Sequence, residues 1–213
     1  MAEDTRDRIV DAAERLFAER GVERTSLRAV TRAAGVNVAA IHYHFGSREE
    51  LLRAVLDKTV RPLNARRLVL LEQALQRSDG ALAVRDILDA FLRPDVEAIE
   101  TLRERDVEIA RFLGRLYAAP APTVERIMGE QFRTVSERFL TELRRSLPGV
   151  RATDIEYTLR LVVGVVVALF TNATPAGEPG PLDTTDVDAT VDRLADFLVP
   201  GFAALKGGAV AAG

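Results

Sequence analysis

Apolar residues recur every three to four positions along almost the whole chain, which is the spacing of one face of an α-helix. Alternation with a period of two, which would indicate strands, is nearly absent. Glycine or proline stands at most of the breaks between the periodic segments. We therefore predict an all-α fold of about nine helices.

The N-terminal part is expected to hold three helices. The first runs over about residues 5–20, with Ile9, Ala13 and Phe17 on its inner face. Two short helices follow within residues 26–45, because apolar residues keep one helical face on both sides of a turn at Ala34-Gly35-Val36. The pattern predicts a helix-turn-helix.

A long connecting helix is expected over about residues 48–76. Ser47 and Glu50 have the S-x-x-E form of a capping box at its start. Pro62 lies inside this helix and is expected to bend or break it, since proline removes one backbone hydrogen bond. We therefore divide the chain into a helix-turn-helix domain, residues 1–48, and a larger helical domain, residues 49–213.

The larger domain is expected to continue with further helices. Pro94 suits a first helical turn, and Thr153-Asp154-Ile155-Glu156 repeats the capping-box form. A loop rich in proline and glycine spans residues 174–183, and residues 206–213 are expected to fray. The expected helices cover residues 83–93, 94–118, 123–147, 157–172 and 185–205.

Composition excludes several classes of protein. The chain has no cysteine, which excludes disulfides and thiolate sites and fits a reducing cytosol. Its N-terminus is acidic and amphipathic, without the apolar core of a signal peptide. The most apolar window, residues 161–170, is far shorter than the ~20 residues that span a bilayer. We expect a cytoplasmic protein that does not enter a membrane.

Positive charge gathers in one segment of a chain whose formal net charge is −3. Residues 24–48 hold four arginines and two histidines and no acidic residue. A basic surface on two short helices around a turn is typical of proteins that bind DNA. His42 and His44 diverge around the helix, so a shared metal site is not expected, and no cofactor is predicted.

Residues 9–56 resemble the N-terminal domain of the tetracycline-repressor (TetR) family of bacterial transcriptional regulators. The resemblance is carried by a spaced series: Ile9, Ala13, Phe17, Gly21, Thr25-Ser26-Leu27, Ala34-Gly35-Val36, Ile41-His42-Tyr43-His44-Phe45 and Ser47-Arg48-Glu49-Glu50-Leu51. It implies a homodimeric regulator, most simply a repressor, that binds a palindromic operator in double-stranded DNA. A small-molecule effector, bound in the C-terminal domain, would release the DNA.

The resemblance and the chemistry of the side chains give a candidate DNA-binding surface. Asn37 is best placed to cap the second helix of the motif, whose first turn enters the major groove. Base contacts would depend on Asn37, on thymine-methyl contacts and on Arg28 or Arg32. His42 either packs or contacts the DNA backbone. The full candidate set is Thr25, Ser26, Arg28, Asn37, Val38, Ala39, His42, Tyr43, His44 and Arg48, of which Thr25, Ser26, Tyr43, His44 and Arg48 match phosphate-contacting positions of the family.

A mostly apolar effector pocket is expected in the C-terminal domain. Its ligand is expected to be a small hydrophobic compound, a class in which we include acids and acyl compounds. Arg111 and Arg115 are candidates to bind an acidic head group, or else they pair with glutamates on their own helix. The candidate lining residues, each of which an ordinary helical core also needs, are Phe91, Leu102, Ile109, Phe112, Leu113, Leu116, Tyr117, Met128, Phe132 and Phe139.

Dimerisation is expected through the last two helices, as the resemblance implies. The helix over residues 157–172 has no polar face in its apolar run and must be covered on all sides. The candidate interface residues are Leu161, Val162, Val165, Val166, Leu169, Val191, Leu194 and Leu198.

Two other functions remain as alternatives. An all-helical enzyme is disfavoured because both histidines lie in the helix-turn-helix and no H-E-x-x-H, G-x-S-x-G or phosphate-binding glycine loop is present. A helical adaptor with a vestigial helix-turn-helix is not excluded by the sequence.

Overall fold

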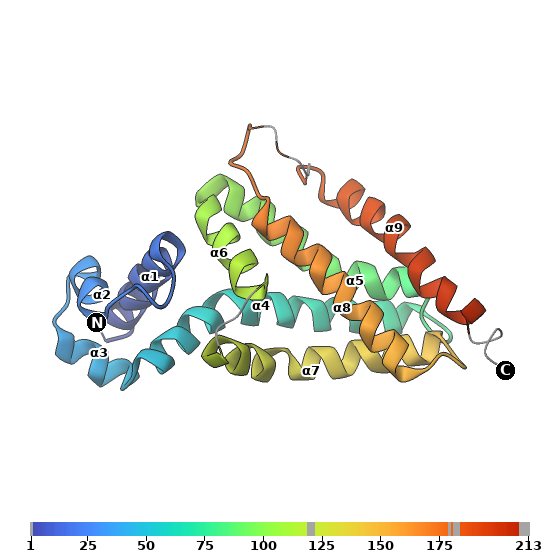
Figure 1. Ribbon diagram of the computed structural model, residues 1–213, viewed down its shortest axis with the longest axis horizontal. Coiled ribbons are helices and arrows are strands. Elements are labelled where there is room, and N and C mark those ends of the chain that lie inside the picture. The colour runs from blue at the N-terminus through green and yellow to red at the C-terminus, as the bar shows by residue number, and fades with distance from the viewer. Residues whose placement is uncertain (1, 119–121, 179, 181–183, 209–213) are drawn as a thin grey trace.

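The computed structural model describes residues 2–118, 122–178, 180 and 184–208, which form nine helices and no strand (Figure 1). The prediction of an all-α fold is confirmed. No helix in this part of the chain is long and apolar enough to cross a membrane. The helices are α1 (Ala2–Arg20), α2 (Leu27–Ala34), α3 (Val38–Phe45), α4 (Arg48–Arg77), α5 (Val84–Arg105), α6 (Val107–Ala118), α7 (Pro122–Ser146), α8 (Ala152–Thr171) and α9 (Val187–Gly208).

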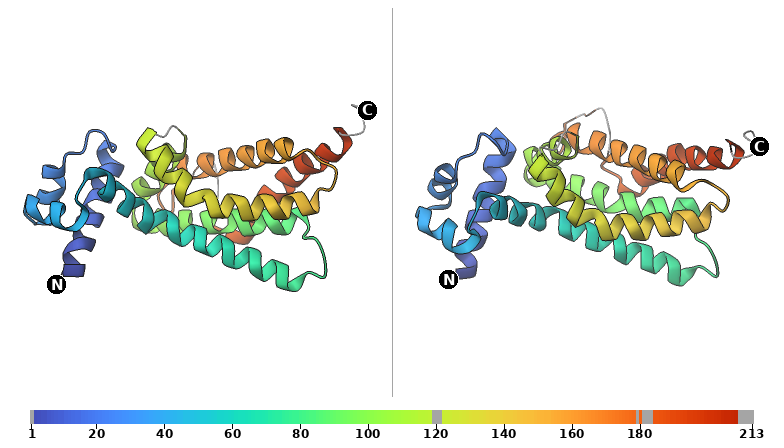
Figure 2. Two further views of the ribbon diagram at one scale, coloured as in Figure 1. Left: turned by 90° about the horizontal axis from the view of Figure 1, so that it is seen from below. Right: turned by 60° about the horizontal axis from the view of Figure 1, so that its bottom comes forward.

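The helices form two groups joined by α4 (Figures 1 and 2). Helices α1–α3 pack around the first turns of α4 at one end of the molecule. From there α4 runs under the second group, where α5 and α7 pack against it. Helix α8 lies on the side away from α4 in both views of Figure 2, and α9 packs on α5 and α8.

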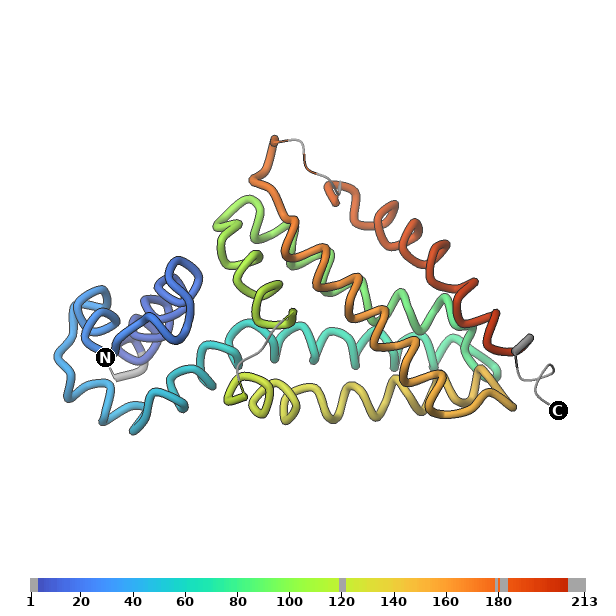
Figure 3. The backbone as a smooth tube through the Cα atoms, in the orientation of Figure 1, coloured from blue at the N-terminus to red at the C-terminus, as the bar shows by residue number. Residues whose placement is uncertain are grey.

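Helix α4 runs unbroken from Arg48 to Arg77 with Pro62 in its interior. Figure 3 shows the helix changing direction within its first half, so α4 bends and does not break. Its buried side carries Val60, Asn64, Arg67 and Leu71 at helical spacing across the proline. Packing of this side against α5 and α7 holds both halves in one element.

The expected helix boundary at Pro94 is wrong. Helix α5 passes through Pro94, which is buried, and ends at Arg105, because the backbone of the next residue, Asp106, leaves the helical region with φ −166° and ψ 89°. The Asp106 carboxylate accepts a hydrogen bond from the Glu108 backbone N–H at 3.1 Å and so caps α6. The local cap therefore sets this boundary, and the proline does not.

The two capping-box predictions differ in outcome. Ser47 caps α4, since its Oγ accepts from the Glu50 N–H at 3.1 Å. The second prediction is wrong, because α8 begins before Thr153, at Ala152, and its N-cap residue is Arg151. Asp154 instead accepts two hydrogen bonds from the Arg151 guanidinium, at 2.9 and 3.0 Å. An ion pair across the first turn stabilises the start of α8 in place of a side-chain cap.

The apolar interior forms two clusters. The C-terminal cluster is built from α4, α5 and the helices that follow. The N-terminal cluster joins α1–α3 and the start of α4, but it also contains side chains from α6 and α7, namely Phe112, Leu116, Val124 and Ile127. The N-terminal core is therefore completed by the second group of helices. Part of the 174–183 loop and residues 209–213 of the tail lie outside the described residues.

Candidate DNA-binding surface and ligand cavity

Local caps set the positions of α2 and α3. The Ser26 Oγ accepts from the Ala29 N–H at 3.2 Å and begins α2. Gly35 ends α2 at φ 65°, a left-handed conformation that glycine adopts without strain. The Asn37 Oδ1 then accepts from the Ala40 N–H at 2.9 Å and begins α3, as predicted. The turn between the two helices is thus fixed by their caps.

Contacts from α1 hold this turn in place. The Arg8 guanidinium donates to the Ala34 carbonyl at 2.6 Å. Below the turn Val30, Ile41 and Phe45 are buried against α1 and α4. The angle between α2 and α3 is therefore set both by the core and by a charged hydrogen bond to the backbone.

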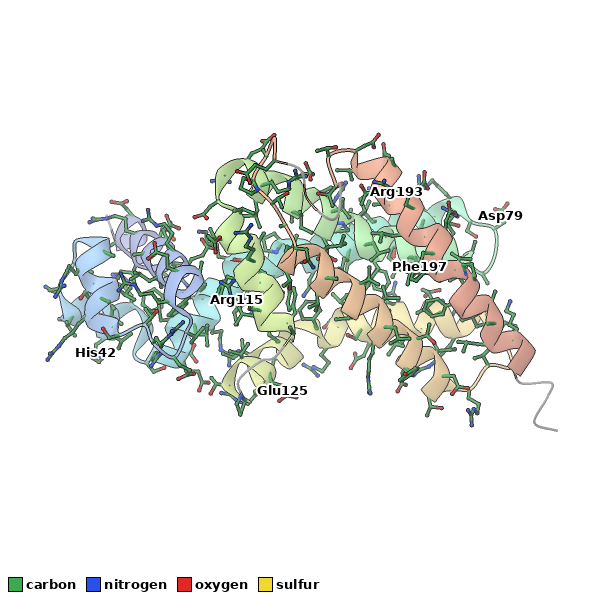
Figure 4. All side chains as sticks on the ribbon, turned by 45° about the horizontal axis from the view of Figure 1, so that its top comes forward. His42, Asp79, Arg115, Glu125, Arg193 and Phe197 are labelled. Atoms are coloured by element: carbon green, nitrogen blue, oxygen red, sulfur yellow. The ribbon has the colours of Figure 1, made fainter. Side chains whose placement is uncertain are left out.

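The outer side of α3 is open to solvent at one end of the molecule, where Figure 4 labels His42. Tyr43 is 83% exposed and Val38 41% exposed. Asn37, Ala39 and His42 are also exposed. The side chains of Arg28 and Arg32 project from α2 without a hydrogen bond or ion pair to any described residue. The surface offers hydrogen-bond donors and positive charge, and residues 24–48, which include both helices, contain no acidic residue.

Three predicted DNA-contact residues are partly or fully buried. Thr25 is buried, and its hydroxyl donates to the carbonyls of Leu16 at 3.1 Å and Gly21 at 2.9 Å, so the prediction of a phosphate contact by this hydroxyl is wrong. Arg48 is half-buried and donates to the Val22 carbonyl. His44 is half-buried with its ring 5.1 Å from that of Tyr43, edge to face. Of the remaining predicted residues, Ser26 is exposed.

Two arginines of α1, Arg6 and Arg8, were not among the predicted residues. Arg8 supports the turn, as described above, and Arg6 is exposed with its guanidinium 5.4 Å from the centre of the Phe45 ring. Arg6 therefore adds positive charge beside the end of α3. Both lie in the acidic first segment, where their sign is masked when charge is summed along the chain.

A cavity of about 270 Å³ lies among five helices of the second group. Its walls are mostly apolar, and its exposed lining residues, Glu125, Gly129 and Val163, mark a mouth between α7 and α8. Figure 4 labels Glu125 near the start of α7. The lining residues are Arg67, Phe91, Leu116, Tyr117, Glu125, Met128, Gly129, Phe132, Ser136, Leu159, Val163 and Val166.

Half of the predicted pocket residues line this cavity: Phe91, Leu116, Tyr117, Met128 and Phe132. The other five do not. Phe139, Leu113 and Leu102 pack in the C-terminal core, with the Phe139 ring 5.2 Å from that of Phe91. Phe112 and Ile109 face the N-terminal core, where Phe112 packs on Phe17 at 6.4 Å. Helical spacing marks all of these residues as buried, but it does not say which face meets the cavity.

A buried ion pair borders the cavity and was not predicted. The Arg67 side chain is 2% exposed and that of Asp95 0% exposed, and the Arg67 Nη2 donates to the Asp95 Oδ2 at 2.5 Å. The same guanidinium donates to the Phe91 carbonyl at 3.0 Å and to the Asn64 Oδ1 at 2.7 Å. Its charge also lies over the rings of Phe91 at 4.9 Å and Phe132 at 5.6 Å. Each of the three guanidinium nitrogens of Arg67 therefore donates a hydrogen bond within the protein.

Two polar atoms near this ion pair have no hydrogen-bond partner among the described residues: the Tyr117 hydroxyl and the Asp95 Oδ1. Burial raises the pKa of Tyr117 above its ordinary value, and the nearby Asp95 charge raises it further. Burial likewise raises the pKa of the Asp95 carboxyl, against the opposing effect of Arg67. Tyr117 therefore stays protonated and able to donate.

The two arginines expected to bind an acidic ligand bond elsewhere. Arg111 donates to the Ala173 carbonyl at 3.0 Å and to Glu108 at 2.6 Å. Arg115, on α6 in Figure 4, donates to the Ala18 carbonyl of α1 at 2.8 Å. Neither lines the cavity, so the pairing alternative applies to Arg111 and the head-group role has no support.

Most residues predicted for a dimer interface are buried within the single chain. They are Val162, Val166, Leu169, Val191 and Leu198, so these five side chains are covered by the chain itself. Leu161 is 53% exposed, whereas Val165 and Leu194 are half-buried. The exposed large apolar residues of α8 and α9 instead include Tyr157 at 63% and Phe197 at 76%. Because α8 packs on α6 and α7, its apolar run is used mainly inside the chain.

Helix α6 connects the cavity with the N-terminal core. Leu116 lines the cavity and also belongs to the N-terminal apolar cluster. On another side, α6 packs closely on α8 at Gly114, where a Cβ would lie 2.6 Å from the Thr171 backbone nitrogen. A displacement of α6 at the cavity wall is therefore transmitted directly to α1, which packs on α6 and on the helix-turn-helix.

Comparison with known families accounts for both groups of helices. Residues 9–55 match the family described as bacterial regulatory proteins, tetR family. Residues 89–201, more than half of the chain, match the tetracyclin repressor-like C-terminal domain. The N-terminal match covers α1–α3 and the first turns of α4, and the C-terminal match covers most of α5 to α9.

Individual relatives agree with these matches. An uncharacterised HTH-type transcriptional regulator of Mycobacterium tuberculosis (strain CDC 1551 / Oshkosh) is 30% identical over 190 residues, covering 82% of this chain and 92% of its own. The HTH-type transcriptional regulator TtgR of Pseudomonas putida is 48% identical over 56 residues, but these are only 26% of this chain and 27% of TtgR. This chain therefore spans only about a quarter of the length of the first curated relatives that it matches. Among solved structures, a bacterial regulatory protein in the tetR family from Rhodococcus RHA1 has the same fold, with a TM-score of 0.67 at 16% identity over 93% of this chain and 96% of its own.

Proposed function

Because the chain belongs to the tetracycline-repressor (TetR) family of bacterial transcriptional regulators, we propose that it is a dimeric repressor whose palindromic operator is released when a small molecule fills the cavity. The observation that carries the proposal is the outer side of α3. It combines an N-terminus capped by Asn37, an exposed Tyr43 and neighbouring free arginines with an absence of acidic side chains over residues 24–48. This is the chemistry that contacts bases and phosphates.

The roles on this surface follow from the side chains. Asn37 uses its Oδ1 for the cap, so its amide group is left to donate to a base edge or a phosphate. Val38 and Ala39 fit contacts with thymine methyl groups. Ser26, Tyr43 and the free arginines, together with Arg6, face the DNA backbone. Thr25 and the Arg48 guanidinium, which donates to the Val22 carbonyl, position the motif and do not contact DNA.

A dimer through α8 and α9 is supported by their exposed apolar residues. Tyr157, Leu161, Gly164 and Ala168 are exposed and share one face of α8 at helical spacing. Phe197, labelled in Figure 4, is exposed on α9. A twofold pairing of this surface would cover the large apolar side chains that the single chain leaves in water.

The dimer surface has a matched test. Phe197→Glu or Leu161→Glu places a charge in the proposed interface and is expected to give monomers by light scattering. Val69→Glu is the control, because Val69 is an apolar residue on α4 that is 48% exposed outside this surface. Val166 is unsuitable as a test position, since it is 3% exposed and lines the cavity. A monomeric wild type, or a monomeric Val69→Glu variant with dimeric Phe197→Glu, contradicts the interface.

Release of DNA is supported by the connection through α6. A ligand that displaces Leu116 or Tyr117 acts on a helix that packs on α1 and donates to it through Arg115. The contact between Gly114 and Thr171 fixes the other side of α6. A ligand changes operator affinity only as far as it favours one arrangement of α6 and α1 over the other.

DNA binding is tested by selecting genomic fragments with the purified protein and measuring affinity for the enriched sequence by fluorescence anisotropy. We expect an inverted repeat and an affinity that falls steeply with salt. Arg138→Ala, an exposed arginine on α7 that lies within 4 Å of Glu72, is a charge-matched control for Arg28→Ala. Enrichment of no sequence, or an equal loss of affinity in both variants, overturns the assignment of α2 and α3 to DNA.

A further inference from the structure

The charges around the cavity are already balanced by the protein. Arg67 is the one cationic residue of the lining, and Asp95 pairs with it at 2.5 Å. The other charged lining residue is Glu125, at the mouth. A carboxylate entering the cavity would need a free cation, or would have to take Arg67 from Asp95 and leave a buried, uncompensated charge. The cavity therefore disfavours anions.

The remaining polar requirement is a hydrogen bond. Tyr117 is one of the lining residues, and its hydroxyl is buried and has no partner among the described residues. A buried hydroxyl without a partner is unfavourable, and a ligand removes this penalty by accepting a hydrogen bond from it. The neighbouring rings of Phe132 and Phe170, each 6.0 Å from Tyr117 and edge to face, fix the direction of the hydroxyl.

The rest of the lining fits flat rings. Phe91, Phe132 and Tyr117 contribute aromatic surface, and Leu116, Met128, Leu159 and Val166 contribute aliphatic surface. A volume of about 270 Å³ is near the lower end for small-molecule sites, which suits a compact ring system and not a long chain.

We propose that the cavity binds a neutral ring compound with one hydrogen-bond-accepting oxygen, such as an aryl ketone, and that the Tyr117 hydroxyl donates to this oxygen. Tyr117 is then the specificity-determining residue, and the Arg67–Asp95 pair excludes acids by leaving no free cation. The inference rests on the proposed function only where it identifies this compound as the effector.

The test compares ligands that share one ring system. The probes are 2-acetylnaphthalene, its hydrocarbon analogue 2-ethylnaphthalene, and the acid 2-naphthoate. Isothermal titration calorimetry measures the affinity of each probe. We expect the ketone to bind about fivefold to tenfold more tightly than the hydrocarbon, and the carboxylate to bind more weakly than either.

Two variants separate the hydroxyl from the shape of the cavity. Tyr117→Phe keeps the ring, and we expect it to bring the ketone to the affinity of the hydrocarbon while hydrocarbon binding is unchanged. Ser136→Ala removes the other lining hydroxyl and is expected to leave the ketone preference as it is. Circular dichroism checks that both variants fold.

Each outcome decides the inference. Tightest binding by 2-naphthoate, or a ketone preference that survives Tyr117→Phe, overturns it, as does the absence of binding by all three probes. These titrations contain no DNA, so they are independent of the proposed function. Ketone binding that leaves operator affinity unchanged contradicts effector release but supports the ligand class, whereas operator release by the acid alone supports regulation and overturns the ligand class.

Discussion

The DNA-facing surface and the cavity are built in opposite ways. Residues 24–48 carry most of the DNA-facing surface within one short segment. The caps made by Ser26 and Asn37 and the turn at Gly35 all involve residues close together in sequence. The cavity takes side chains from five helices between Arg67 and Val166. Its polar group is a buried ion pair whose members are 28 positions apart. The ends of α2 and α3 are therefore set by neighbouring residues, whereas the cavity depends on how five helices pack together.

The largest expected effect is on the cavity side. Arg67→Met leaves the Asp95 carboxylate buried without a counter-charge and is expected to cost about 3–5 kcal/mol of unfolding free energy. Arg66→Met is the control, since Arg66 is exposed and lies 3.5 Å from Glu97 in a surface pair that contributes about 1 kcal/mol or less. Urea unfolding at one protein concentration measures both. Equal losses in the two variants would remove the distinction between the assembled site and the surface.

A second test acts where the cavity and the DNA-binding domain meet. Gly114→Ala places a Cβ 2.5–2.9 Å from three atoms of Thr171, and we expect a loss of about 1–3 kcal/mol together with altered operator affinity. Gly129→Ala is matched in helix context but meets no atom within 4 Å, so it is expected to be neutral or to stabilise by up to about 1 kcal/mol. A stable Gly114→Ala protein with unchanged DNA binding would show that α6 is free to move away from α8.

The DNA-facing surface should behave differently. Tyr43→Ala removes a side chain that is 83% exposed, so unfolding free energy should change by less than about 0.5 kcal/mol. Affinity should fall by about 1–2 kcal/mol on all DNA sequences, because a phosphate contact carries no sequence information. Asn37→Ala should instead change the preferred sequence. A sequence-dependent loss for Tyr43→Ala would contradict its assignment to phosphate.

The smallest expected effect is a pH dependence. The pKa of Tyr117 is raised in the folded chain, so above the ordinary tyrosine pKa of about 10 the unfolded chain loses this proton first. Unfolding is then favoured as pH rises, and stability declines above about pH 10. Tyr117→Phe should make this decline shallower, as measured by urea unfolding between pH 9 and about pH 11. An identical decline in wild type and variant would mean that Tyr117 is not protected by burial.

The sequence predicted what is decided locally. The helical period gave the fold class, and the S-x-x-E pattern at Ser47 correctly located the start of α4. Prediction failed where a distant partner decides. Thr25 has a side chain suited to phosphate, but its hydroxyl reaches carbonyls at the end of α1. Pro94 does not interrupt α5, because tertiary packing outweighs the local penalty.

The cavity shows the same division. Asn64 and Arg67 are polar residues within an otherwise apolar buried stripe of α4, and this is a signal that periodicity alone can reveal. The identity of the partner, Asp95, is set by how α5 crosses α4 and has no counterpart in local sequence. For the same reason the exposed face of α8 and its buried face could not be separated in a run that is apolar all round.

The shared N-terminal core bears on attempts to build hybrid regulators from this chain. Phe112, Leu116, Val124 and Ile127 fill the space between the helix-turn-helix unit and the rest, although by sequence they belong to the C-terminal domain. A chimera joined after the first turns of α4 would bring in foreign side chains at these four positions. Grafting should therefore succeed when the transplanted helix-turn-helix domain is chosen, or redesigned, to pack against these four side chains. A biosensor made by simple exchange of domains would lose either folding or response, because the two parts of this core would no longer fit.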